Sequence, residues 1–116
     1  MTEGASILMS AIWSMLQIGA WRDERGVNLL DTGAHFYDTY ETKDGGFIAL
    51  GSIEPKFYAL LREQAGLSGP EWDDHMDPAR WAALKEELAS IIATRTRDEW
   101  CSAMEMATPA SRRSCR

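Results

Sequence analysis

Few side chains in this sequence could carry acid–base or metal chemistry, and the two imidazoles are the first to consider. His35 begins an aromatic, Thr-rich run, whereas His75 lies in the acidic string WDDHMD, with Asp73, Asp74 and Asp77 around it. An imidazole among carboxylates could bind a hard cation, but the spacing is not that of a calcium-binding loop. A solvated loop is the favoured interpretation, and no metal site is predicted.

The other reactive residue types do not form a recognisable active site. No Ser-His-Asp arrangement, phosphate-binding glycine loop or CxxC pair can be assembled from the sequence. Asp31 and Asp38 could act as general bases, but no pattern places them in a pocket. We interpret them as a turn residue and a strand-surface residue. The chain therefore offers no self-contained catalytic site.

Glu54 is the acidic residue with the most unusual position. It follows a short apolar strand, in the string GSIEP, and a strand-to-helix corner there would direct its carboxylate away from the edge of the sheet. A carboxylate at the start of a helix is also favoured by the helix dipole, which is an equally good structural explanation. The position of Glu54 alone does not decide between a functional and a structural role.

The first element that must position these residues is a long helix predicted over residues 2–20. After Glu3 this stretch has no charged residue, and apolar side chains cover most of its surface. Ser10, Ser14 and Gln17 add a weakly polar stripe, and Glu3 stands where a signal peptide would have a basic residue. We interpret the stretch as a buried helix of a soluble protein rather than a membrane span. Such a helix is expected to pack against another domain or subunit.

A β-hairpin and three helices are predicted to follow, so the fold class is α+β. His35–Thr42 and Phe47–Gly51 have the composition of strands, and the string KDGG between them is typical of a hairpin turn, because glycine accepts a positive φ. The helices are expected to begin after Glu54, Asp77 and Thr96. Their apolar faces are predicted to comprise Phe57, Leu60, Leu61 and Ala65, then Trp81, Leu84, Leu88, Ile91 and Ile92, then Trp100 and Met104.

Size and charge narrow the possible partners. A chain of 116 residues has room for a single modest core, so a large active site would have to be shared. The net charge of -6 argues against nucleic acid or an anionic membrane as a partner, since both require clustered Lys and Arg. Two cysteines, Cys101 and Cys115, form neither a disulfide framework nor a metal motif, which favours a cytoplasmic location.

One long string carries a specific resemblance. The stretch from Asn28 to Leu61, NLLDTGAHFYDTYETKDGGFIALGSIEPKFYALL, resembles the segment of α-methylacyl-CoA racemases that reads roughly N-x-L-D-G-G-A-P-F-Y-x-x-Y-x-x-x-D-G-x-x-x-A-V-G-x-I-E-P-x-F-Y. These racemases share the fold of the family III CoA-transferases. The string Ser52-Ile53-Glu54-Pro55 favours the racemases, because the transferases usually read like Gly-Asn-Asp there. His35 departs from the pattern, which has Pro, and is expected to alter the rim of the site.

The resemblance implies proton removal and return at the α-carbon of a 2-methylacyl-CoA, with CoA as part of the substrate and no separate cofactor. The family's catalytic His and Asp belong to a large domain and have no counterpart in this chain. The family forms an interlocked homodimer, so Glu54 would hydrogen-bond the catalytic His of the partner subunit, while Leu30, Tyr37 and Ile53 would line the acyl side of the pocket. The isolated chain is therefore expected to be inactive.

Both ends of the chain differ from the family pattern. Met1 aligns with an interior residue of the family, and the resemblance stops near Met104. Read one frame away, the codons of the tail permit DACFAPVL, the strand with which the family continues. We therefore divide the chain into a helix and linker from a large domain (1–27), an incomplete small domain (28–106) and a frameshifted, non-native tail (107–116).

Three interpretations of the whole chain stay open at this point. The first is an inactive fragment of a racemase. The second is a fragment of a family III CoA-transferase. The third is a non-catalytic module that docks on an intact paralogue and supplies Glu54 to it.

Overall fold

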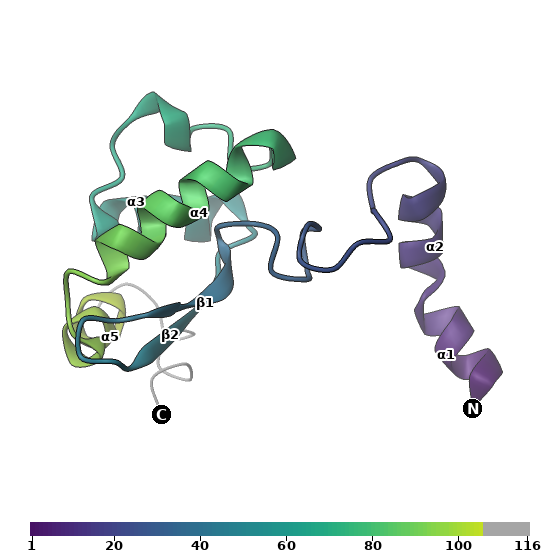
Figure 1. Cartoon of the computed structure of the whole chain (residues 1–116), viewed down its shortest axis with the longest axis horizontal. Helices are drawn as coiled ribbons and strands as arrows, with labels where there is room; N and C mark the ends of the chain where they lie inside the picture. Colours follow the sequence, from purple (N-terminus) through teal and green to yellow (C-terminus); the bar gives the residue numbers. More distant parts are fainter. Residues whose placement is uncertain (106–116) are drawn as a thin grey trace.

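A computed structural model describes residues 1–105, and the tail assigned above to a frameshift lies outside the described residues. The described part has an α+β fold, as predicted. The elements in chain order are α1 (Thr2–Leu8), α2 (Ser10–Gln17), β1 (Tyr37–Glu41), β2 (Phe47–Gly51), α3 (Pro55–Ala65), a 3-10 turn (Pro70–Trp72), α4 (Pro78–Ile92) and α5 (Arg97–Glu105). Figure 1 shows α1 and α2 as an arm, joined by an irregular segment to a body that holds all the other elements.

The arm differs from the single long helix that the sequence predicts. Met9 divides it into α1 and α2, because its ψ of 3° departs from helical geometry. Hydrogen bonds from Met9 N to Ala5 O and from Trp13 N to Met9 O continue across the break at 3.0 Å, so the helix is interrupted rather than ended.

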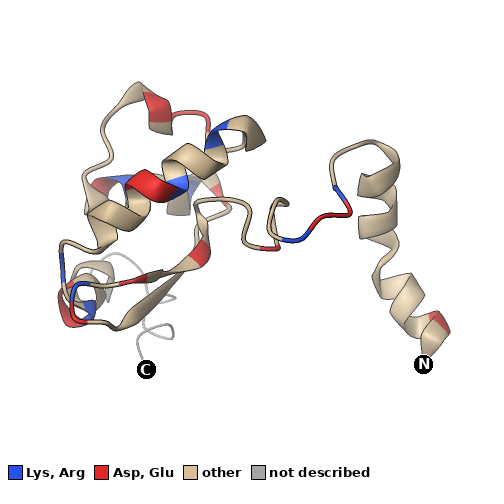
Figure 2. Ribbon diagram, viewed as in Figure 1, with Lys and Arg blue, Asp and Glu red and all other residues tan. Residues whose placement is uncertain are grey.

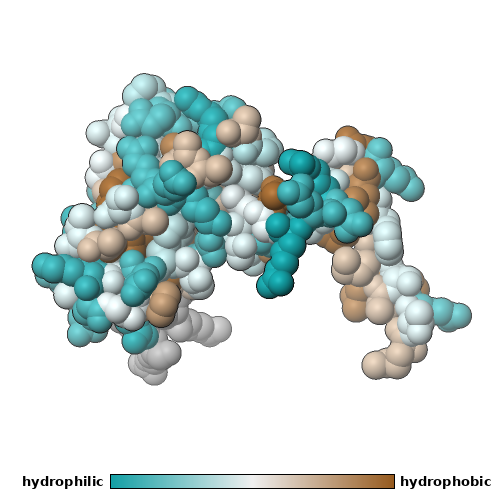
Figure 3. Space-filling model, in the orientation of Figure 1, coloured by the Kyte–Doolittle hydropathy of each residue, from teal (hydrophilic) through white to brown (hydrophobic). Residues whose placement is uncertain are grey.

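The apolar surface of the arm is exposed. Neither α1 nor α2 buries a residue, and Leu8 and Ile18 are 84 % and 78 % exposed. Figures 2 and 3 show an arm almost without charged residues and with hydrophobic atoms at its surface. No helix in the described part of the chain is long and apolar enough to cross a membrane. Since neither helix buries a residue, the described body does not cover the apolar surface of the arm.

The hairpin has one covered face and one open face. Its register pairs Tyr37 with Gly51 and Tyr40 with Ile48, and the predicted KDGG turn closes it, with Gly45 at a φ of 78°. Because side chains alternate along a strand, the register divides the two strands between the faces. The covered face carries Asp38, Tyr40, Ile48 and Leu50, whereas the open face carries Tyr37, Thr39, Glu41, Phe47, Ala49 and Gly51.

The core lies between the covered face of the hairpin and the helices. It includes the large, fully buried side chains Phe36, Trp72, Leu88, Ile92 and Trp100. The predicted core positions of α4 are confirmed except for Ile91, which is only partly buried. The predicted face of α3 is partly wrong: Leu61 and Ala65 are buried, but Tyr58 takes the place expected for Phe57 and Leu60.

The predicted starts of α4 and α5 are confirmed by their hydrogen bonds. Asp77 Oδ1 accepts from the backbone N–H of Ala79 at 3.1 Å and caps α4. Thr96 and Glu99 form a reciprocal capping box, in which Thr96 N donates to Glu99 Oε2 at 2.7 Å and Glu99 N donates to Thr96 Oγ1 at 3.3 Å.

Candidate functional site

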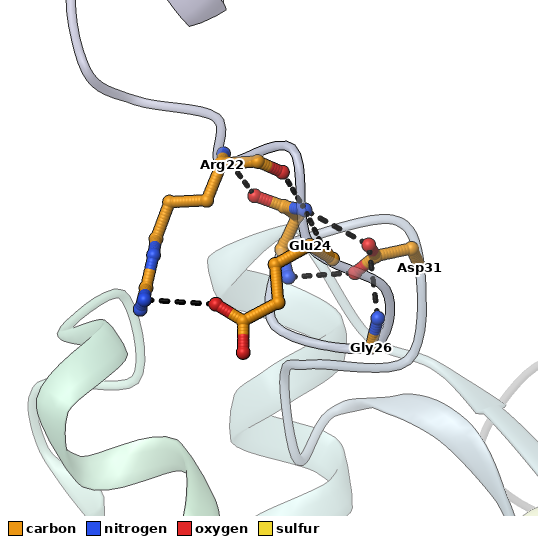
Figure 4. A network of polar contacts seen from close by, with 5 residues as sticks. Arg22, Glu24, Gly26 and Asp31 are labelled. Carbon is orange, nitrogen blue, oxygen red and sulfur yellow. Dashed lines mark hydrogen bonds and ion pairs between the residues drawn. The ribbon is translucent and has the colours of Figure 1, made fainter.

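The loop that precedes the hairpin is held by a network around Asn28 and Asp31 (Figure 4). The side-chain amide of Asn28 donates to the carbonyls of Arg22 and Glu24 and to Asp31 Oδ2, and its oxygen accepts from Arg22 N at 2.7 Å. The carboxylate of Asp31 also accepts from the backbone N–H groups of Asn28 and Gly26, at 2.6 and 3.2 Å. Each of these groups satisfies another group of the same loop, which gives the loop one defined conformation.

The hydrogen bonds also determine the character of Asp31. Burial by itself would raise the pKa of its carboxyl, but the hydrogen bonds from Asn28 and Gly26 outweigh burial and lower the pKa. A carboxylate stabilised in this way is a weaker base. Asp31 lies in a turn, as predicted.

Two backbone features complete the loop. Thr32 has a φ of 73°, the left-handed region that a β-branched residue rarely adopts, and is the one non-glycine residue with a positive φ in the described chain. Gly33 approaches the backbone so closely that a Cβ there would lie 2.4 Å from Val27 C. The loop thus has little freedom to rearrange, and Leu30 is 47 % exposed at its surface.

Three of the four predicted site residues lie at the same end of the hairpin. Tyr37 begins β1 opposite Gly51, and Ser52 N donates to Phe36 O at 3.0 Å, so Ile53 and Glu54 leave the sheet beside Tyr37. Tyr37 and Ile53 are partly buried, and both pack against the core. Leu30 comes from the preceding loop.

Glu54 occupies the corner between β2 and α3. It is the N-cap residue of α3, yet its side chain makes no capping hydrogen bond. Its one ion pair in the described chain is with Lys56, at 3.5 Å, and both side chains are well exposed. Exposed pairs of this kind contribute little stability. The carboxylate therefore faces solvent and can be reached by another molecule.

His75 lies near this corner and is partly buried, so the prediction of a solvated loop around it is wrong. Its ring stacks on Tyr58 with centroids 4.1 Å apart, and its Nε2 lies 3.4 Å from Ile53 O. The acidic neighbours are used elsewhere, since Asp73 pairs with Arg62 at 2.7 Å and Asp77 caps α4. Within residues 1–105 no three His, Cys, Asp or Glu side chains gather to hold a metal ion. No local signal relates His75 to Ile53, because 22 residues separate them.

The sequence predicts His35 at the rim of the site, and this prediction is wrong. The side chain of His35 is fully buried in the core, next to the fully buried Phe36. Its Nε2 lies 2.9 Å from Tyr58 Oη, and its Nδ1 is buried without a hydrogen-bond partner. Burial, with a smaller effect from nearby His75, lowers the pKa of His35 from 6.5 to about 4.

The lowered pKa of His35 predicts acid sensitivity. Between about pH 6.5 and pH 4 the unfolded chain binds a proton at His35 and the folded chain does not, so the free energy of unfolding decreases as the pH falls. We expect a loss of about 2 kcal/mol between pH 7 and pH 5. Urea titrations of the chain and of His35→Gln across this range measure it. Equal pH slopes for the two proteins would contradict the prediction.

Lys85 of α4 connects the loop to the hairpin. Its ammonium lies 2.6 Å from Asp38 Oδ2, and it also donates to the carbonyl of Thr32. Asp38 is thus a partly buried, ion-paired residue on the covered face of β1 rather than the strand-surface residue that was predicted.

Comparison with known proteins identifies the family. The model of the CoA-transferase family III matches residues 1–113. Over 101 residues, 87 % of this chain, the sequence is 46 % identical to an α-methylacyl-CoA racemase of Mus musculus and 43 % identical to one of Homo sapiens. It is 33 % identical over 103 residues to a CaiB/baiF CoA-transferase family protein of Caenorhabditis elegans. The chain spans 26 % of the length of each racemase and 28 % of the worm protein. The chain belongs to the CoA-transferase family III.

Proposed function

We propose that this chain is the small-domain segment of an α-methylacyl-CoA racemase, and that Glu54 is its contribution to catalysis. The observation that carries the proposal is the exposed carboxylate of Glu54, which follows Ile53 at the end of the hairpin where Tyr37 begins β1. The identities of 43 % and 46 % to racemases support the racemase rather than the transferase reaction. In this proposal residues 1–27 belong to the large domain and residues 28–106 to the small domain.

The proposed reaction is removal of the α-proton of a 2-methylacyl-CoA, followed by return of a proton to the opposite face. Glu54 would accept a hydrogen bond from the imidazole of the catalytic His of the partner subunit. That bond would fix which ring nitrogen carries the proton and raise the basicity of the other. Leu30, Tyr37 and Ile53 would form the apolar wall for the acyl chain. The substrate supplies its own CoA, and no separate cofactor is needed.

The proposal includes an interlocked homodimer in the cytoplasm. The exposed apolar surface of α1 and α2 supports association, because a helix arm of this composition is stable in water only when it is covered. An active site completed by the partner explains why a carboxylate with a catalytic role lies at the surface of its own chain. The isolated chain has no counterpart of the family's catalytic His and Asp and is expected to be inactive.

A hybrid enzyme tests the proposal. The matching segment of the mouse racemase is replaced by residues 1–105 of this chain, and deuterium uptake at the α-carbon of a 2-methylacyl-CoA is measured in heavy water. We expect uptake with the hybrid and none with the isolated chain. Glu54→Gln in the hybrid is expected to lower kcat about 100-fold, because a neutral amide cannot stabilise the protonated imidazole.

Glu63→Gln is the matched control, since Glu63 is an exposed carboxylate of α3, the helix that Glu54 precedes. It is expected to leave kcat unchanged. A folded, dimeric hybrid without uptake would contradict the racemase proposal. Transfer of CoA to an added carboxylate by that hybrid would favour a CoA-transferase instead, the class to which the worm relative is assigned by its name. Restored activity on mixing this chain with a racemase that lacks its small domain would favour a docking module.

A further inference from the structure

Lys85 is placed where one side chain holds two separate segments. It projects from α4 and pairs with Asp38 Oδ2 of β1 at 2.6 Å, and the same ammonium donates to the carbonyl of Thr32 in the loop. The side chains of Lys85 and Asp38 are only 29 % and 17 % exposed, whereas the pair of Lys56 with Glu54 is largely exposed. A partly buried, charge-assisted contact of this kind fixes geometry more firmly than a surface ion pair.

The two contacts of Lys85 lie next to two residues of the proposed acyl wall. Thr32 is two positions after Leu30, and Asp38 directly follows Tyr37. Since adjacent residues of a strand point to opposite faces, Asp38 faces the covered side of the hairpin and Tyr37 faces the open side. Lys85 is therefore separated by the sheet from an acyl chain on the open face, and its effect on Tyr37 passes through the backbone.

The backbone of Thr32 needs such a contact. A φ of 73° at a β-branched residue is unfavourable and persists only where the surroundings impose it. The Asn28 and Asp31 network fixes the residues before Thr32, and Gly33 N donates to Asn28 O at 3.0 Å after it. Lys85 supplies the remaining contact, on the carbonyl of Thr32 itself.

We propose that Lys85 is a positioning residue that holds Leu30 and Tyr37 as one preformed wall and thereby determines which acyl chains are accepted. The contact of this wall with a branched acyl thioester rests on the proposed function. The placement of the wall by Lys85 rests on the structure of this chain alone. A wall that is ordered before binding discriminates between chain lengths better than a loose one, because little ordering is needed when the acyl chain enters.

Amide hydrogen exchange of the full 116-residue chain tests the placement. Lys85→Met is expected to speed exchange of the Gly33 amide roughly tenfold, since it removes a charge-assisted hydrogen bond from the loop. Lys43→Met, at an exposed lysine of the hairpin turn, is expected to leave this rate unchanged, and Lys85→Arg is expected to restore most of the protection. Exchange of the Leu88 amide monitors whether α4 stays folded. An unchanged Gly33 rate in folded Lys85→Met overturns the proposal.

The hybrid enzyme provides a second measurement, a ratio of two kcat/KM values, which a general loss of stability would not change. Lys85→Met is expected to lower the ratio of kcat/KM for a long over a short 2-methylacyl-CoA roughly tenfold, with kcat for the short one unchanged. A mere loss of folded enzyme lowers both values equally and leaves the ratio constant, which would overturn the proposal. If the unsubstituted hybrid is inactive, the proposed function fails, and the exchange measurement decides the placement by itself.

Discussion

Replacing Phe36 with alanine is expected to lower the free energy of unfolding by about 3 to 5 kcal/mol, the largest effect of any single substitution considered for this chain. Phe36 is fully buried, and its ring meets those of His35 and His75 with centroids 5.1 Å away and that of Trp81 at 6.2 Å. Truncation would leave a cavity where the start of the hairpin joins the helices. The total free energy of unfolding of a small domain is only about 5 to 15 kcal/mol, so much of the folded population would be lost.

Urea unfolding followed by tryptophan fluorescence measures this effect. Phe47→Ala is the matched control, because Phe47 is an exposed phenylalanine on the open face of β2. It is expected to change the free energy of unfolding by less than about 1 kcal/mol. The prediction fails if the two alanine variants have the same urea midpoint.

Gly33→Ala is expected to destabilise the chain by about 3 kcal/mol or to unfold the loop before the hairpin. The added Cβ would lie 2.4 Å from Val27 C, 2.5 Å from Asn28 O and 2.6 Å from Asn28 N. These are backbone atoms, so no side-chain rotation can relieve the overlap. The nearby network of Asn28 and Asp31 would have to separate, which exposes polar groups that now satisfy one another.

Thermal unfolding together with exchange of the Asn28 amide distinguishes the two outcomes. Global destabilisation lowers the melting temperature, whereas local opening speeds exchange at Asn28 with a smaller change in melting. Gly51→Ala provides the comparison, since the nearest atom to its added Cβ is Tyr37 Cε2 at an ordinary 4.0 Å. Parent-like melting and exchange in Gly33→Ala would show that the close approach is unimportant.

The locally encoded parts of the fold are predictable from the sequence. The KDGG turn, the caps at Asp77 and Thr96 and the strand-to-helix corner at Glu54 each follow from residues within a few positions of one another. The turn and the corner place Tyr37, Ile53 and Glu54 at one end of the hairpin.

The parts that depend on tertiary packing are not predictable in the same way. Phe57 and Leu60 have the right spacing for a buried face, but the aromatic cluster around Phe36 selects Tyr58 instead. His35 is polar and was expected at a rim, yet it is buried because Tyr58 supplies a hydrogen bond there. Lys85 lies 53 residues from Thr32 in the sequence, so no local pattern predicts their contact.

The two faces of the hairpin have a consequence for how a lineage of such proteins diverges. Residues on the covered face, such as Asp38, Tyr40 and Leu50, are constrained by the folded core. Residues on the open face, such as Thr39 and Ala49, are exposed and contribute less to folding. Mutations can therefore accumulate on the open face with little penalty in stability. In the proposed racemase, selection can then adjust the preference for one substrate over another while the covered face of the hairpin stays unchanged.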